Sequence, residues 1–159
     1  MKRLTAILLL CSLFLSGCGN SLKEPVTFYY LSINYEEEMS PAIASEQREA
    51  SGHRDDILYL MALYLMGPAD EDLYSPLPKD TTIQSAEQHG TNVTITLSDI
   101  SNSMTASRFT LVCSCLTLTC LELTEATNVT INSGDRSITM SAEDLLLQDL
   151  ITAGTEDTQ

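Results

Sequence analysis

The chain has 159 residues, of which 22 are acidic and 8 are basic, so its formal net charge at pH 7 is −14. This length is enough for one domain with a hydrophobic core of its own. A surface of this charge repels nucleic acid and anionic lipid headgroups, which excludes polyanion binders and favours basic or neutral partners.

The chain opens like an exported bacterial protein. Two basic residues follow Met1, and an apolar run then extends over residues 4–15. That run has the length of the hydrophobic part of a signal peptide and is too short to span a membrane comfortably. We therefore expect residues 1–17 to be a signal peptide that the mature protein has lost.

The apolar run ends in a motif that favours lipid attachment. In Leu15-Ser16-Gly17-Cys18, small residues give a peptidase access to the backbone, and the thiol can receive a diacylglycerol, as in the bacterial lipobox. We expect Cys18 to be the lipid attachment site and residues 18–25 to be the lipidated tether. A lipid chain would hold the protein at the extracytoplasmic face of the bacterial cell membrane without spanning it.

The first elements of the mature chain are a strand and a loop. Residues 26–33 (VTFYYLSI) are rich in β-branched and aromatic side chains, which predicts a strand. Residues 35–52 are polar and acidic, and we expect a solvated loop there. Glu36, Glu37 and Glu38 stand in a row within it, but a metal site would need ligands from several elements, so no metal is expected.

A first helix is predicted over the ten apolar residues 57–66. Asp55 and Asp56 precede it and suit the positive end of a helix dipole. Gly67-Pro68 follows as a C-terminal stop. Because apolar residues cover every side of this helix, we expect it to be largely buried.

A hairpin and a second helix follow. Residues 81–86 and 93–97 predict two strands, joined by a turn at residues 89–92 that contains Gly90. Apolar residues then recur at intervals of three and four over residues 106–123, which predicts a helix.

The chain closes on a second hairpin and a short helix. Residues 128–132 and 137–140 predict the strands, which a Gly-containing turn connects. Ser141 can cap a last helix over residues 145–151. We expect one domain over residues 26–152 and a disordered tail over residues 153–159.

The order β-α-ββ-α-ββ predicts an α+β fold, in which a small mixed sheet has helices packed on one face. The pentapeptide TNVTI occurs twice, at residues 91–95 and 127–131, and both copies fall on predicted hairpin strands. Two interpretations are open: a weak internal repeat, or coincidence in a threonine-rich sequence.

The residue types that carry catalysis and metal binding are few. His53 and His89 stand outside any nucleophile or metal motif and are interpreted as solvated surface residues. Cys113, Cys115 and Cys120 lie on the second helix, where the outer two are about 10 Å apart along the axis. Disulfides need closer Cα atoms, and no second cluster could complete a zinc site, so the three are interpreted as small buried hydrophobes. We expect no catalytic residue, no metal and no cofactor.

Several blocks of the chain follow one another in a recognisable order. They are Leu65-Met66-Gly67-Pro68 and residues 75–81, 93–98, 116–121 and 129–134. Together, behind a lipobox, they resemble the GerMN domain of sporulation and spore germination lipoproteins over about residues 26–140. The chain departs from the sporulation member of the family in having one copy of the domain and not two in tandem. It also has an unusual cysteine-rich second helix, and Thr96 where an acidic residue is frequent.

The resemblance implies a non-enzymatic domain, similar to the small ring-building domains of envelope assemblies. It implies a membrane-anchored extracytoplasmic lipoprotein with a protein-interaction domain, acting in sporulation or spore germination envelope assembly. The partners expected are the membrane, through the lipid on Cys18, and envelope proteins. The family carries no binding residue over to this chain, because the matching positions are those of turns and core.

The alternative function is an envelope lipoprotein that binds a small solute, a peptide or a cell-wall fragment. An interaction domain predicts an exposed edge strand or an apolar patch. A ligand-binding lipoprotein predicts a concave pocket with converging polar groups.

Overall fold

The computed structural model describes residues 24–33 and 41–145 of the chain. The predicted signal peptide, Cys18, the acidic triplet at residues 36–38 and the tail all lie outside these residues. The elements, in chain order, are β1 (Pro25–Ser32), β2 (Ile43–Glu49), α2 (Ile57–Leu65), β3 (Leu73–Tyr74), β4 (Ile83–His89), β5 (Asn92–Leu97), the 3-10 turn η1 (Ser101–Ser103), α3 (Ala106–Leu123), β6 (Asn128–Ser133) and β7 (Arg136–Ser141).

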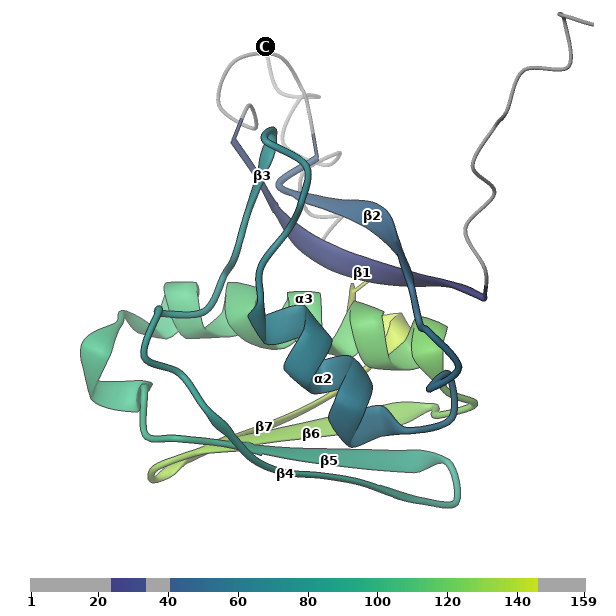
Figure 1. Cartoon of the computed structure of the whole chain (residues 1–159). Coiled ribbons are helices and arrows are strands. Elements are labelled where there is room, and N and C mark those ends of the chain that lie inside the picture. The colour runs from purple at the N-terminus through teal and green to yellow at the C-terminus, as the bar shows by residue number, and fades with distance from the viewer. Residues whose placement is uncertain (1–23, 34–40, 146–159) are drawn as a thin grey trace, which may run out of the picture.

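Two sheets enclose the helices, as Figure 1 shows. Strands β4-β5-β6-β7 form a four-stranded mixed sheet, and β2-β1-β3 form a smaller sheet. Helix α3 packs against β1 on one side and against β6 and β7 on the other, while α2 packs against β4. The α+β class is confirmed, and the four-stranded sheet is the mixed sheet with helices on one face. The first predicted strand, residues 26–33, is β1, but it lies with β2 and β3 in a second sheet on the other side of α3, where the prediction had a single sheet.

The two TNVTI copies lie side by side in the four-stranded sheet. Strands β5 and β6 are parallel and joined through α3, and their register pairs Asn92 with Asn128 and Thr94 with Thr130. Identical residues therefore face each other across neighbouring strands. The inward-facing Val and Ile of each copy are fully buried, so both copies contribute equally to the core.

The prediction of a solvated loop over residues 35–52 is wrong for residues 43–49, which form β2. Strand β2 pairs with β1 along its whole length in antiparallel register. The sequence concealed it because two inward-facing positions carry Glu46 and Arg48. Charged side chains at these positions remove the alternation of apolar and polar residues by which a half-buried strand is recognised.

Helix α2 begins and ends near its predicted bounds. Asp56 is its N-cap, and the Asp56 side chain accepts a hydrogen bond from the Tyr59 N–H at 3.0 Å. Gly67 follows with φ of +81°, a left-handed conformation that favours glycine and stops the helix. The expectation that α2 is largely buried is wrong for one side. The buried residues of the helix are Leu60, Met61 and Tyr64.

Helix α3 has the predicted bounds and is the central element of the core. Its buried residues run from Val112 to Thr117 without a break and include Phe109. Cys113, Cys115 and Cys120 are buried and free, which confirms their interpretation as small hydrophobes. By length and composition α3 could also cross a membrane, but it is enclosed between the two sheets of this domain.

Both predicted hairpins are confirmed, as β4–β5 and β6–β7. Residues 142–145 are helical, and the Ser141 N–H donates to the Asp144 carboxylate at 2.7 Å, as expected at a helix start. The rest of the helix predicted over residues 145–151 lies outside the described residues.

Candidate functional site

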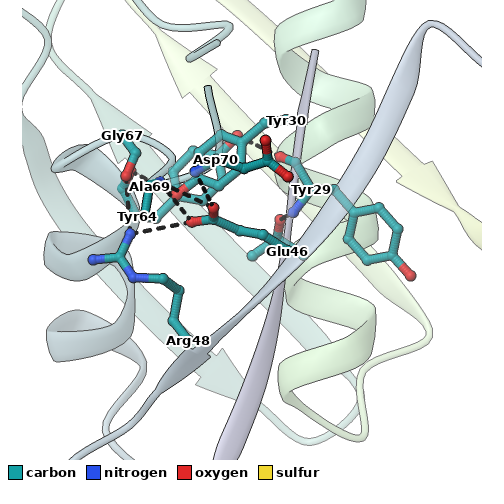
Figure 2. A network of polar contacts seen from close by, with 9 residues as sticks. Tyr29, Tyr30, Glu46, Arg48, Tyr64, Gly67, Ala69 and Asp70 are labelled. Carbon is teal, nitrogen blue, oxygen red and sulfur yellow. Dashed lines mark hydrogen bonds and ion pairs between the residues drawn. The ribbon is translucent and has the colours of Figure 1, made fainter. Parts of the chain in front are cut away.

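A network of polar contacts fixes the segment that follows α2, and Figure 2 shows it from close by. Glu46 and Arg48 point inward from β2. The N–H groups of Ala69 and Asp70 donate to Glu46 Oε2 at 2.9 and 3.0 Å. Arg48 Nη1 donates to the Gly67 carbonyl at 2.9 Å and lies 3.2 Å from Glu46 Oε1. With these partners, both charged groups hold the loop in place, and neither is free for chemistry.

Two tyrosines join the small sheet to α2. The rings of Tyr30 and Tyr64 stack with centroids 4.7 Å apart, and Phe28 meets both rings edge-on. Tyr64 donates its hydroxyl to the Tyr29 carbonyl at 2.9 Å, and Tyr30 donates to the Tyr64 carbonyl at 3.2 Å. Burial raises the pKa of Tyr64 well above 10 and, with the Glu46 charge, also raises the pKa of Tyr30. Both therefore remain protonated and act as hydrogen-bond donors in the core.

The two edges of the small sheet differ. On the β3 side, side chains cap the backbone of β1: Tyr29 N–H donates to Thr119 Oγ1 at 3.0 Å, and Arg54 donates to the Pro25 carbonyl at 2.7 Å. On the other side, no strand within the described ranges pairs with the outer edge of β2. Strand β2 is thus an edge strand, as are β3, β4 and β7. Its inward-pointing Glu46 and Arg48 are a known protection of such edges against uncontrolled pairing.

A hollow of about 590 Å³ lies where the start of α2, the end of α3 and the end of β4 meet. Its lining includes the apolar residues Ile57, Leu60 and Leu123. Three acids, Asp55, Glu122 and Glu125, and one base, Arg54, also line it. This hollow has the size of a small-ligand site, and acidic residues outnumber basic ones in its lining.

The histidines are not brought together. His53 is exposed and stacks on Tyr59 with ring centroids 4.2 Å apart. His89 is exposed in the β4–β5 turn, 3.3 Å from the Glu87 carboxylate. Both lie on the surface, as the sequence predicted. Across residues 24–33 and 41–145, no group of three potential ligands is placed to hold a metal ion.

One serine–aspartate contact resembles a catalytic pair but has a structural role. Ser101 donates its hydroxyl and its N–H to Asp99 Oδ1, at 2.6 and 3.0 Å. These hydrogen bonds lower the pKa of the Asp99 carboxyl. The Asp99 carboxylate accepts the N–H of Ser101, the first residue of η1, and so holds the start of this turn. Among the described contacts Asp99 has no histidine partner, so the pair is not a catalytic arrangement.

The buried thiols of α3 are unreactive in the folded domain. Burial raises the pKa of Cys113, Cys115 and Cys120 from 9.0 to about 12. The nucleophilic form of cysteine is the thiolate, which is scarce near neutral pH at such a pKa.

The sequence did not predict the exposed side of α2. Leu58 and Met66 are 51% and 76% exposed, and Ala62, four residues from each, is exposed as well. Positions four apart lie on the same side of a helix, so these residues form one apolar stripe. The ten-residue apolar run indicated a surplus of apolar surface. Because every position in it is apolar, the sequence could not show which side of the helix faces the core.

Comparisons with known proteins agree with the sequence pattern. The sequence profile of the family described as Germane, sporulation and spore germination, matches residues 27–139. No curated protein sequence matches the chain at a significant level.

Two solved structures are similar to the chain. One contains the tandem GerMN domains of the sporulation protein GerM from Bacillus subtilis, with a TM-score of 0.52 and 21% identity over 70% of this chain and 39% of that one. This chain thus spans less than half of the tandem structure. The other is a crystal structure of a candidate lipoprotein from Clostridium perfringens, with a TM-score of 0.46 and 19% identity over 76% of this chain and 88% of that one.

Proposed function

Because the chain belongs to the Germane family of sporulation and spore germination proteins, we propose that it is a lipid-anchored interaction domain of the cell envelope. In this proposal, Cys18 carries the lipid at the extracytoplasmic face of the membrane. The domain joins an envelope protein assembly in sporulation or spore germination, and it uses no metal or cofactor.

The observation that carries the proposal is the apolar stripe on α2, which residues 24–33 and 41–145 leave exposed. Exposed contiguous apolar surface on a strongly charged protein is typical of protein–protein contact sites. The exposed edge of β2 supports the same function. The family is not one of enzymes, and the polar contacts of the described residues stabilise loops and strands.

Lipid attachment rests on Leu15-Ser16-Gly17-Cys18 behind an apolar run. In the bacterium that encodes the chain, Cys18→Ala should move the protein from the membrane fraction to the soluble extracytoplasmic fraction. The matched control is Cys11→Ala, which changes the cysteine inside the leader. Unchanged membrane association of Cys18→Ala would contradict lipid anchoring.

The interaction function is tested by chemical crosslinking in native membranes, followed by mass spectrometry, during growth and during sporulation. The expected result is a stage-dependent set of envelope proteins joined to the chain. A crosslinked fraction without any protein partner at either stage would contradict the interaction function.

One observation favours a second candidate function, the binding of a basic small solute or peptide. The hollow is lined by three acids, Asp55, Glu122 and Glu125, against one base, Arg54, together with apolar residues. Calorimetric titration with spermidine and with a Lys-containing tripeptide would detect such binding. Glu122→Gln with Glu125→Gln should then weaken it, and absence of heat with either ligand removes this candidate.

A further inference from the structure

The outer side of α2 is apolar and has no cover among the described residues. Leu58, Ala62 and Met66 are exposed, and Leu65, which shares this side, is partly exposed. Figure 1 shows α2 at the near side of the molecule, in front of α3. From Leu58 to Met66 the stripe is about 12 Å long, at 1.5 Å of rise per residue. We call these four residues the α2 stripe.

Both ends of the α2 stripe are acidic. Asp55 and Asp56 are exposed immediately before the helix. Three further exposed acids follow it, namely Asp70, Glu71 and Asp72. The helix itself carries no charged residue. The stripe is therefore an apolar strip with negative charge at each end.

The basic residues near α2 offset this charge only in part, since Arg54 directly precedes Asp55 and Asp56 and leaves that end of the stripe with a net charge of −1. Arg54 donates to the Pro25 carbonyl at 2.7 Å, and Arg48 donates to the Gly67 carbonyl beneath the loop. Arg48 also pairs with the Glu46 carboxylate at 3.2 Å. Neither guanidinium is directed to the carboxylates that flank the stripe.

We propose that the α2 stripe is a docking surface for a basic amphipathic helix of another envelope protein, with an apolar side of about three turns and Lys or Arg at both ends. The inference rests on the proposed interaction function and names the chemistry of its partner. Apolar side chains of the partner cover Leu58, Ala62 and Met66, and its basic ends meet the two acidic clusters. Complementary charge of this kind sets orientation and association rate, and the short apolar strip sets the contact.

Charge complementarity decides between this partner and two others. A second copy of the chain would place acids against acids at both ends of the stripe, whether the two helices run parallel or antiparallel. A bilayer rich in anionic lipid would repel the same clusters, at about 1 kcal/mol per charge near the surface. A basic amphipathic helix satisfies the apolar strip and both ends together.

The test uses the full lipidated chain in its own membranes. A photoreactive benzoyl-phenylalanine replaces Ala62 in one strain and Thr139, on the outer side of β7, in another. We expect light to join the Ala62 position, and not the Thr139 position, to a protein. Mass spectrometry of the adduct should identify a peptide with apolar residues at intervals of three and four, flanked by Lys or Arg.

Side-chain variants in the Ala62 strain test the two parts of the surface. Leu58→Ser with Met66→Ser should reduce the adduct at least tenfold, while Thr139→Ser, which changes an exposed residue on β7, should leave it intact. Glu71→Lys should reduce it about two- to fivefold, the effect of one exposed charge pair. Raising the salt concentration should lower the yield in the unsubstituted chain.

Four outcomes would overturn the inference. They are an adduct at Ala62 with a second copy of the chain, an adduct with lipid, an adduct peptide without basic residues, and protein adducts at Thr139 alone. In the last case untargeted crosslinking still recovers envelope proteins, so the interaction function stands while the α2 stripe is excluded as its site.

Discussion

The two helices of the domain differ in burial, and the more apolar helix is the less buried one. Helix α2 is a run of apolar residues, yet Leu58 and Met66 are more than half exposed. Helix α3 contains serines and threonines, yet Ser114, Thr117 and Thr119 are fully buried. Position explains the difference: α3 lies between two sheets, while α2 has the sheet edge at β4 on one side and solvent on the other.

Burial therefore follows the layer in which a helix lies more closely than its average hydrophobicity. The buried polar groups of α3 are mostly satisfied within the fold. Thr119 accepts the Tyr29 N–H, and Ser114 donates to the Thr110 carbonyl at 3.0 Å. The apolar residues exposed on α2 have no such compensation among the described residues, which is why we propose them as a contact surface.

The largest expected effect on stability comes from a charge placed on the buried side of α2, in contrast to one placed on its exposed side. Leu60→Asp should unfold the domain, because an unpaired charge in the core costs several kcal/mol and the whole domain is stable by only about 5–15 kcal/mol. Leu58→Asp should change the free energy of unfolding by less than about 0.5 kcal/mol, since Leu58 is 51% exposed and Leu60 only 1%. Thermal unfolding followed by circular dichroism checks both. A cooperatively melting Leu60→Asp variant would mean that this side of the helix is not buried.

Alkaline pH should lower the stability of the domain through ionisation of the buried thiols of α3. The pKa of each buried thiol is about 12 in the folded chain and 9.0 when unperturbed. The unfolded chain thus releases these protons first, so stability is full below pH 9 and falls as pH rises from 9 towards 12. The buried tyrosines Tyr30 and Tyr64, whose pKa lies above 10, add to the loss only at higher pH.

Urea unfolding of residues 18–159, with Cys18→Ser, measures this loss at several pH values. Between about pH 9 and pH 10 the decline should be shallower when Cys113→Ala and Cys120→Ala are added, because fewer thiols titrate on unfolding. An unchanged slope in that variant would assign the decline to other groups.

The smallest expected effect is a gain in stability. The hydroxyl of Thr117 is buried and has no hydrogen-bond partner in the part of the chain that the structure describes. Thr117→Val has a similar shape and removes an unsatisfied polar group, so it should raise the free energy of unfolding by about 1 kcal/mol. Thr119→Val is the matched control, because it removes the acceptor of the Tyr29 N–H and should destabilise. Urea titration measures the stability of both variants. A change in the same direction for both would contradict the difference in hydrogen bonding between Thr117 and Thr119.

Spacing predicted the elements whose inward residues are apolar. Phe109, Val112 and Leu116 recur at helical intervals, and the predicted bounds of α3 match the structure. The predicted strands with Val-x-Ile on their inner side are β5 and β6. In these places, the local pattern and the burial in the fold agree.

Three features could not be predicted from the spacing of apolar residues, because they depend on contacts between distant parts of the chain. Strand β2 turns Glu46 and Arg48 inward, where they bind backbone atoms of the loop after α2 that are 23 and 19 residues away in the sequence. The exposed side of α2 has the same residue types as its buried side. The hollow beside Glu122 joins three separate elements, so only the folded chain brings its lining together.

The position of β1 has a mechanical consequence. A pull on the N-terminal segment reaches the described fold at Pro25, the first residue of β1. That strand is the middle one of its sheet, and Val26, Phe28 and Tyr30 fix it in the core with no more than 2% of their surface exposed. In the proposed anchored state, tension on the segment before Pro25 would act on a strand that pairs with β2 from Pro25 to Leu31 but with β3 only at Leu31 and Ser32, so the β1–β2 hydrogen bonds and the buried side chains of β1 would carry the load.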